Sequence, residues 1–202
     1  LFRSGKAVYV LEGNINYTGA VITWLKDSLK LIESPGDTEE LAEEANPDDT
    51  TYLIPGFTGL GAPYWDSRAV GMYYGMTRLT GKAELVKAGL ESIAYQITDV
   101  VLAMEEESGI PIGELRADGG PTRNRYLMQF QSDMAGIPVS VPPAEELSGI
   151  GAAYAAGIAM GIYDREQLFA RMGRRTFRPA MDPGTRDMKY GGWKHAVAKV
   201  LN

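Results

Sequence analysis

The chain has 202 residues, of which 45% are hydrophobic and 23% are charged, a composition typical of a globular protein with a buried core. It contains no cysteine, which excludes disulfides and thiolate metal sites and fits a reducing compartment. A single histidine, His195, argues against a histidine metal cluster or a Ser-His relay, and the net charge of −6 argues against a nucleic-acid partner.

The sequence favours a protein without membrane contact. No signal peptide opens it, and it starts at Leu1 rather than at a methionine, so we expect a cytoplasmic protein of which this chain is one part. The longest uncharged run, residues 147–163, is short for a bilayer span and rich in Gly and Ala, which favours a buried helix and no membrane contact.

The first third of the chain predicts a strand, a helix and an acidic segment. Residues 7–12 (AVYVLE) have the β-branched and aromatic content of a strand, and a helix is expected from about residue 18 to residue 32. Its buried stripe would comprise Ile22, Leu25, Leu29 and Ile32. The acidic segment at about 33–50 is interpreted as a solvated insertion in which Asp37 caps a short helix.

Strands at 52–54 and 70–76 are expected to flank the loop FTGLGAPYWD. Two of its aromatic residues, Tyr64 and Trp65, could contact a ligand or anchor the loop on the core, and the sequence identifies no partner for Asp66. The longest helix should span residues 82–108, because apolar residues repeat along one stripe and Gly109 with Pro111 provides an end signal.

The second half predicts a parallel strand-helix-strand unit over 114–118, 124–135 and 137–141, with Leu127, Phe130 and Met134 facing the core. Next, Ser148 can cap a helix over SGIGAAYAAGIAMG, whose small residues permit close helix packing or close approach of a bound ring. The arginine cluster in RMGRRTFR (Arg171, Arg174, Arg175 and Arg178) is interpreted as a solvated loop or an interface edge. A helix over 187–201 ends the chain.

The segment ADGGPTRNRYLMQFQSD, residues 117–133, carries the strongest functional signal. It reads as a strand that delivers Gly119 and Gly120 into a helix, and backbone without Cβ atoms can approach a flat or anionic ligand closely. Asn124 would lie in the first helical turn with its amide available for hydrogen bonds. A tight strand-to-helix turn without a ligand is the alternative interpretation. Asp118 could orient a Mg2+-bound water or cap the turn.

Five blocks in one order resemble the FGGY carbohydrate kinases, and among them most closely the C-terminal domain of the glycerol kinases. They are LEGNINYTGAVITWLKDSLKLI, FTGLGAPYWD, GMYYGMTRLTGKAELVKAGLESIAYQ, ADGGPTRNRYLMQFQSD and GIGAAYAAG. The resemblance implies an α/β fold of the actin-like ATPase type. In that fold two ribonuclease H-like domains, each a mixed five-stranded sheet flanked by helices, enclose ATP.

Carried over by position, the resemblance implies adenosine contacts at Gly19, Gly119, Gly120 and Asn124. The family's usual glutamine four residues after the first of these glycines is Thr23 here, a shorter side chain that keeps a hydroxyl. The Gly-Thr-Gly phosphate loop, the general-base aspartate and the polyol-binding residues of the family would all precede Leu1. No catalytic residue and no metal ligand is therefore assigned in this chain.

The activity that the resemblance implies is transfer of the γ-phosphate of ATP, with Mg2+, to a primary hydroxyl of glycerol or a related polyol. The polyol would bind in the missing N-terminal domain, and a homo-oligomer is left open. Two alternatives remain, namely a kinase for another sugar such as xylulose and a non-catalytic nucleotide-binding module. The isolated chain is expected to bind adenine nucleotide weakly and to have no kinase turnover.

Overall fold

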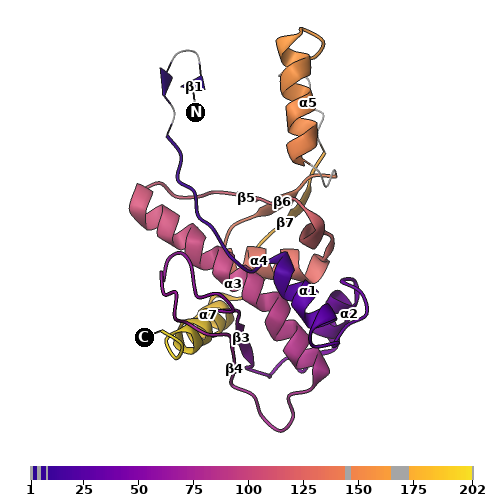
Figure 1. Cartoon of the computed structure of the whole chain (residues 1–202), viewed down its shortest axis with the longest axis vertical. Coiled ribbons are helices and arrows are strands. Elements are labelled where there is room, and N and C mark those ends of the chain that lie inside the picture. Colours follow the sequence, from indigo (N-terminus) through magenta and orange to yellow (C-terminus); the bar gives the residue numbers. More distant parts are fainter. Residues whose placement is uncertain (1, 4–5, 8, 144–146, 165–172, 202) are drawn as a thin grey trace.

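The fold is built around one long helix, α3 (Lys82–Ser108), in a computed structural model that describes residues 2–3, 6–7, 9–143, 147–164 and 173–201. At its start the Glu84 carboxylate accepts a hydrogen bond from the amide of Gly81, at 2.8 Å. At its end Gly109 has a left-handed backbone with φ 66°. These bounds confirm the helix predicted over 82–108. Figure 1 shows α3 crossing the middle of the molecule.

Three helices pack on α3, namely α1 (Gly19–Asp27), α2 (Asp37–Glu44) and α4 (Arg125–Ala135). Gly89 lets α1 approach, because a Cβ atom there would lie 2.8 Å from Cδ1 of Leu25. α1 is shorter than predicted and Leu29 is 40% exposed, not buried. The left-handed backbone of Lys30 turns the chain out of the helix, which explains the difference.

The described residues form three small sheets rather than the predicted five-stranded one. β1 (Phe2–Arg3) pairs with β2 (Lys6–Ala7), and β3 (Tyr52–Ile54) with β4 (Met72–Tyr74), both antiparallel. The third sheet is mixed, because β6 (Val139–Val141) runs parallel to β5 (Leu115–Arg116) and antiparallel to β7 (Arg175–Phe177).

The strand predicted over residues 7–12 is wrong for residues 9–12. Residues 9–12 belong to no strand, and Tyr9 is 92% exposed, in an arm that extends from the body (Figure 1). β-branched and aromatic content makes a strand only where a neighbouring strand supplies hydrogen bonds, and no described strand pairs with residues 9–12.

The parallel strand-helix-strand unit formed by β5, α4 and β6 is confirmed, although both strands are shorter than predicted. Leu127, Phe130 and Met134 are buried, as their spacing predicted. α5 (Leu147–Ala159) contradicts the expected buried helix, since most of it is exposed and it projects from the body (Figure 1). Its many Gly and Ala residues offer little apolar side-chain surface for burial. Ser148 lies inside α5 rather than before it.

The last helix, α7 (Pro183–Val197), packs on β3 and α4. It starts four residues earlier than predicted, because the Asp182 carboxylate accepts a hydrogen bond from the amide of Thr185 at 2.9 Å and Pro183 occupies the first helical position. His195 lies on its exposed face, as expected of a solvated residue. No helix in the described part of the chain is long and apolar enough to cross a membrane.

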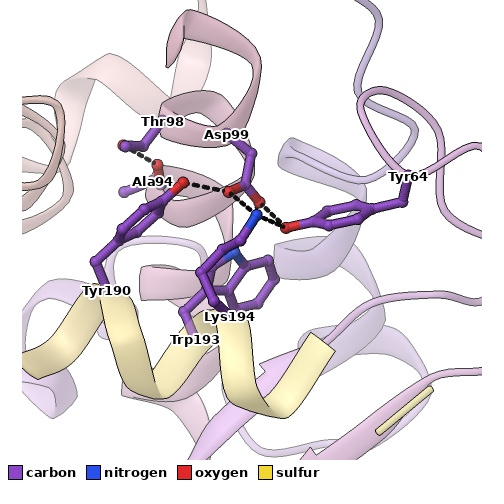
Figure 2. A network of polar contacts seen from close by, with 7 residues as sticks. All are labelled: Tyr64, Ala94, Thr98, Asp99, Tyr190, Trp193 and Lys194. Atoms are coloured by element: carbon purple, nitrogen blue, oxygen red, sulfur yellow. Dashed lines mark hydrogen bonds and ion pairs between the residues drawn. The ribbon is translucent and has the colours of Figure 1, made fainter. Parts of the chain in front are cut away.

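A buried carboxylate, Asp99, joins α3, α7 and the FTGLGAPYWD loop (Figure 2). Tyr64 and Tyr190 donate hydroxyl hydrogen bonds to it at 2.8 and 2.5 Å, and the indole of Trp193 donates at 2.7 Å. The Lys194 ammonium lies 3.6 Å from the same carboxylate. Burial and the adjacent carboxylate raise the pKa of Tyr64 well above its ordinary value. Tyr64 therefore anchors the loop.

Candidate functional site

Gly119 and Gly120, in the turn between β5 and α4, have different backbone conformations. Gly119 has φ 91° and ψ 173°, a conformation that only glycine adopts without strain. Gly120 opens a short 3-10 helix, η1 (Gly120–Arg123), and its φ lies outside the left-handed region. A Cβ atom on Gly120 would meet no protein atom within 4 Å. The fold therefore requires glycine at position 119 but not at position 120.

The sequence predicted Asn124 in the first turn of α4, but Asn124 is the N-cap residue that precedes this helix. Its Oδ1 accepts a hydrogen bond from the amide of Leu127 at 2.8 Å, and its Nδ2 donates to the hydroxyl of Thr38 at 3.0 Å. The Thr38 hydroxyl donates in turn to the carbonyl of Pro35. These contacts fix the Asn124 amide and leave one Nδ2 hydrogen for another partner.

A cavity of about 460 Å³ lies where this turn meets α1 and the start of α2. Four of the five predicted site residues line it: Gly19, Thr23, Gly120 and Asn124. Gly119 lies next to the lining and not in it. The volume is in the range of small-molecule sites. The fold thus brings together residues that are about a hundred positions apart in the chain.

Three glycines on the wall of this cavity have room for a side chain. A Cβ atom on Gly19 would come no closer than 3.7 Å to any other group, one on Gly36 no closer than 3.5 Å, and one on Gly120 would have no neighbour within 4 Å. Protein packing therefore does not require glycine at these positions. Their common effect is to keep main chain bare toward the cavity, which suits a flat ligand that presses against it.

The polar groups of the cavity are partly engaged with one another. The Glu39 carboxylate accepts a hydrogen bond from the amide of Arg125 at 2.8 Å, and Asn124 accepts one from the amide of Leu127, so two of the first three amides of α4 are engaged within the protein and a carboxylate lies at the helix start. The start of α4 is therefore not the open anion site that the sequence suggested. The exposed Thr23 hydroxyl has a long 3.4 Å contact with the carbonyl of Gly19 and keeps its acceptor capacity for a ligand.

The sequence did not predict that the start of α2 and the residues just before it form a wall of the 460 Å³ cavity. Pro35, Gly36, Thr38 and Glu39 line the cavity, and Thr38 is fully buried, although this segment was interpreted as solvated. Asp37 does not cap α2, because Gly36 occupies that position. Its carboxylate accepts hydrogen bonds from Ser34 and from the amide of Glu33, and these lower its pKa to about 2. A Pro-Gly pair before the helix was the only local signal.

A larger cavity of about 940 Å³ is an open groove along α3, α4 and β7, and it contains none of the predicted site residues. Asp118 is exposed and lines neither cavity. Within the described ranges, no three His, Asp or Glu side chains gather in a way that could hold a metal ion. Trp65 is 77% exposed beside the anchored Tyr64, and neither lines the 460 Å³ cavity.

Comparisons with known proteins bear on the family of the chain. Residues 2–160 match the model of the FGGY family of carbohydrate kinases, C-terminal domain. The chain is 50% identical over 198 residues to a glycerol kinase of Carboxydothermus hydrogenoformans, covering 97% of this chain and 40% of that protein. It is 46% identical to a glycerol kinase of Thermus thermophilus, covering 98% and 40%.

Solved structures of kinases have a similar fold over most of this chain. The glycerol kinase of Plasmodium falciparum with ADP superposes with a TM-score of 0.82 at 34% identity, covering 91% of this chain and 37% of that one. A xylulose kinase of Rhodospirillum rubrum superposes with a TM-score of 0.74 at 26% identity, covering 93% and 39%. The chain therefore spans about 40% of the length of its relatives. It belongs to the FGGY family of carbohydrate kinases, as the match to that family's C-terminal domain shows.

Proposed function

We propose that the chain is the adenine-nucleotide-binding C-terminal part of an ATP-dependent kinase that phosphorylates glycerol, or a related polyol, at a primary hydroxyl in the cytoplasm. The observation that carries the nucleotide assignment is the 460 Å³ cavity with its bare glycine walls. The identity of 50% to a glycerol kinase over nearly the whole chain supports the substrate class.

The residues of the cavity fit an adenosine group. Ile22, Pro35 and Pro121 provide apolar surface for the faces of a purine ring. Thr23 and the remaining Nδ2 hydrogen of Asn124 offer polar contacts at its edges. The bare main chain at Gly120 allows the ribose to approach closely. ATP would thus be held by its nucleoside end in this chain.

The contribution of this chain to catalysis is positioning. Phosphoryl transfer depends mostly on orientation and on neutralising charge, and a nucleoside gripped by rigid elements orients the phosphate tail toward the acceptor. Mg2+ would accompany the phosphates of ATP and neutralise developing charge, and no residue of this chain is assigned to it. The acceptor site and the general base would belong to the remaining 60% or so of the kinase, by comparison with the relatives' length.

Labelled ATP tests the proposed activity. The complete protein that contains this chain should transfer the γ-phosphate to glycerol and to xylulose at very different rates, with glycerol preferred. The 202-residue chain alone should bind ADP in calorimetry and yield no phosphorylated product. A preference for xylulose would reassign the substrate. Nucleotide binding without any phosphorylated polyol or sugar from the complete protein would make this a non-catalytic nucleotide-binding module.

A further inference from the structure

Glu39 brings a carboxylate to the candidate nucleotide cavity of about 460 Å³, at the point where α2 meets the start of α4. It lies in the first turn of α2 and is partly exposed, and its Oε2 accepts a hydrogen bond from the amide of Arg125 at 2.8 Å. The residue before it, Thr38, accepts one from Nδ2 of Asn124 at 3.0 Å. Two consecutive residues of α2 thus bind two consecutive residues at the start of α4, which fixes the position of the Glu39 carboxylate.

This carboxylate occupies a place that would otherwise suit an external anion. The first turns of α2 and α4 each carry the positive end of a helix dipole, which favours a negative charge beside them. At the start of α4 the protein supplies that charge itself, through Glu39. A phosphate group next to Glu39 would meet a like charge at short range. The α2 side of the cavity therefore disfavours the phosphate tail of a nucleotide.

The hydrogen-bonding groups at this corner of the cavity match one edge of adenine. An ionised carboxylate only accepts hydrogen bonds and has about four lone-pair sites, so Glu39 can accept from a ligand as well as from Arg125. Asn124 is close by and has one Nδ2 hydrogen left to donate. The protein thus presents an acceptor and a donor together. Adenine carries the complement, since its exocyclic amino group donates and the nearby ring nitrogen N7 accepts.

We propose that Glu39 is a specificity-determining residue that accepts a hydrogen bond from the exocyclic amino group of adenine. Glu39 can do so only if the cavity holds a nucleoside, so this role rests on the proposed function. Guanine and hypoxanthine carry an oxygen in place of that amino group, and an oxygen beside Glu39 would set acceptor against acceptor. The same contact directs the phosphate tail away from α2.

Calorimetric titration with ADP and IDP tests this role in the complete protein that contains this chain. IDP carries an oxygen where ADP carries the amino group, so the parent should bind ADP at least about tenfold more tightly, as expected for one charge-assisted hydrogen bond. Glu39→Gln keeps an oxygen for the amide of Arg125 and turns an N–H toward the base. It should weaken ADP binding about tenfold and strengthen IDP binding, so that the preference for ADP is lost or inverted.

Glu40→Gln is the matched control, because Glu40 is the next residue in the same turn of α2, is exposed and does not line the cavity. It removes the same charge from the same helix end and should keep the parent's preference for ADP. Equal changes in the two variants would reveal a diffuse effect of charge and would overturn the proposal. Both variants should unfold in urea near the parent's midpoint, since Glu39→Gln retains the acceptor for Arg125.

Nucleosides without phosphate locate the contact. Purine riboside has a hydrogen in place of the amino group of adenosine, so the parent should bind it about tenfold more weakly than adenosine, while Glu39→Gln should bind the two within about twofold. If the loss in Glu39→Gln disappears with 2′-deoxyadenosine instead, Glu39 contacts the ribose and the proposed contact is wrong. A parent protein that binds no ADP contradicts the proposed function and this role with it. ADP binding with unchanged selectivity in Glu39→Gln contradicts only the role of Glu39.

Discussion

Gly120→Val should separate nucleotide affinity from stability. The side chain would project into open space, since an added Cβ meets no protein atom within 4 Å, and the backbone of Gly120 is not left-handed. Replacing a glycine at a compatible position stabilises a protein by about 0.4–1 kcal/mol through the unfolded chain. Pro121 restricts the residue before it, which offsets part of that gain. The free energy of unfolding should therefore change by less than about 1 kcal/mol.

The loss should appear in nucleotide affinity. Valine adds three carbon atoms to a cavity of about 460 Å³ at the place where adenosine would contact bare main chain. Overfilling a packed site costs about 1–3 kcal/mol. Because 1.4 kcal/mol corresponds to a factor of ten, the Kd for ADP should rise about 5- to 140-fold. Gly120→Ala, with a single methyl group, should lie at the lower end. Calorimetry measures the Kd, and urea unfolding measures stability.

Gly113→Val is the matched control. Gly113 also has no neighbour within 4 Å of an added Cβ and lies outside the candidate nucleotide cavity, so its valine variant should bind ADP like the parent. Parental affinity in Gly120→Val, with a fold intact by circular dichroism, would refute the placement of adenosine against this turn.

Three further substitutions probe the contacts described above. Asp99→Asn should lower the free energy of unfolding by about 1–3 kcal/mol, because the new amide group would point N–H donors at the donors of Tyr64 and Trp193. Lys194→Met should lower it by less than about 1 kcal/mol, since it removes only an ion pair with a half-exposed lysine. Equal losses in urea unfolding would mean that the ion pair, and not the hydrogen bonds, stabilises this cluster. Asn124→Ala should lose about 1 kcal/mol of stability with its cap, and Asn124→Asp should keep the cap; if both retain parental ADP affinity, the Asn124 amide does not contact the ligand. The pKa of Asp37 is about 2, below its ordinary value of 3.8, so its stabilisation of the turn before α2 is complete above pH 3.8 and is lost as the pH falls toward 2. Asp37→Asn should therefore flatten that part of a plot of unfolding free energy against pH. An unchanged slope would contradict the assigned hydrogen bonds.

Local signals in the sequence predicted the elements on which the candidate site depends. The apolar stripe and Gly109 gave α3 with its correct ends, and Gly119 was correctly placed at a turn between a strand and a helix. Such features are readable because they depend on periodicity and on backbone conformation within a few residues. The family resemblance then pointed to Gly19 and Thr23, which line the same cavity as Gly120.

Features that depend on distant partners were not readable. Glu39 binds an amide 86 positions away, and Thr38 bonds with Asn124 over the same separation, so an acidic helix gave no sign that it forms a cavity wall. The strand predicted over residues 7–12 and the burial predicted for α5 failed for a related reason, since residues 9–12 pair with no described strand and most described residues of α5 are exposed. Composition reports what a segment can form, and its neighbours decide whether it does.

The candidate nucleotide cavity draws its walls from three segments, α1, the start of α2 and η1, that meet only in the folded chain. A ligand bound among them couples the three segments, because unfolding of any one segment also releases the ligand. At a concentration of a hundred times its Kd, such a ligand adds about 2.7 kcal/mol to the free energy of unfolding these segments. Amide hydrogens in all three segments should then exchange with deuterium more slowly and together, whereas those of the projecting α5 keep their rate.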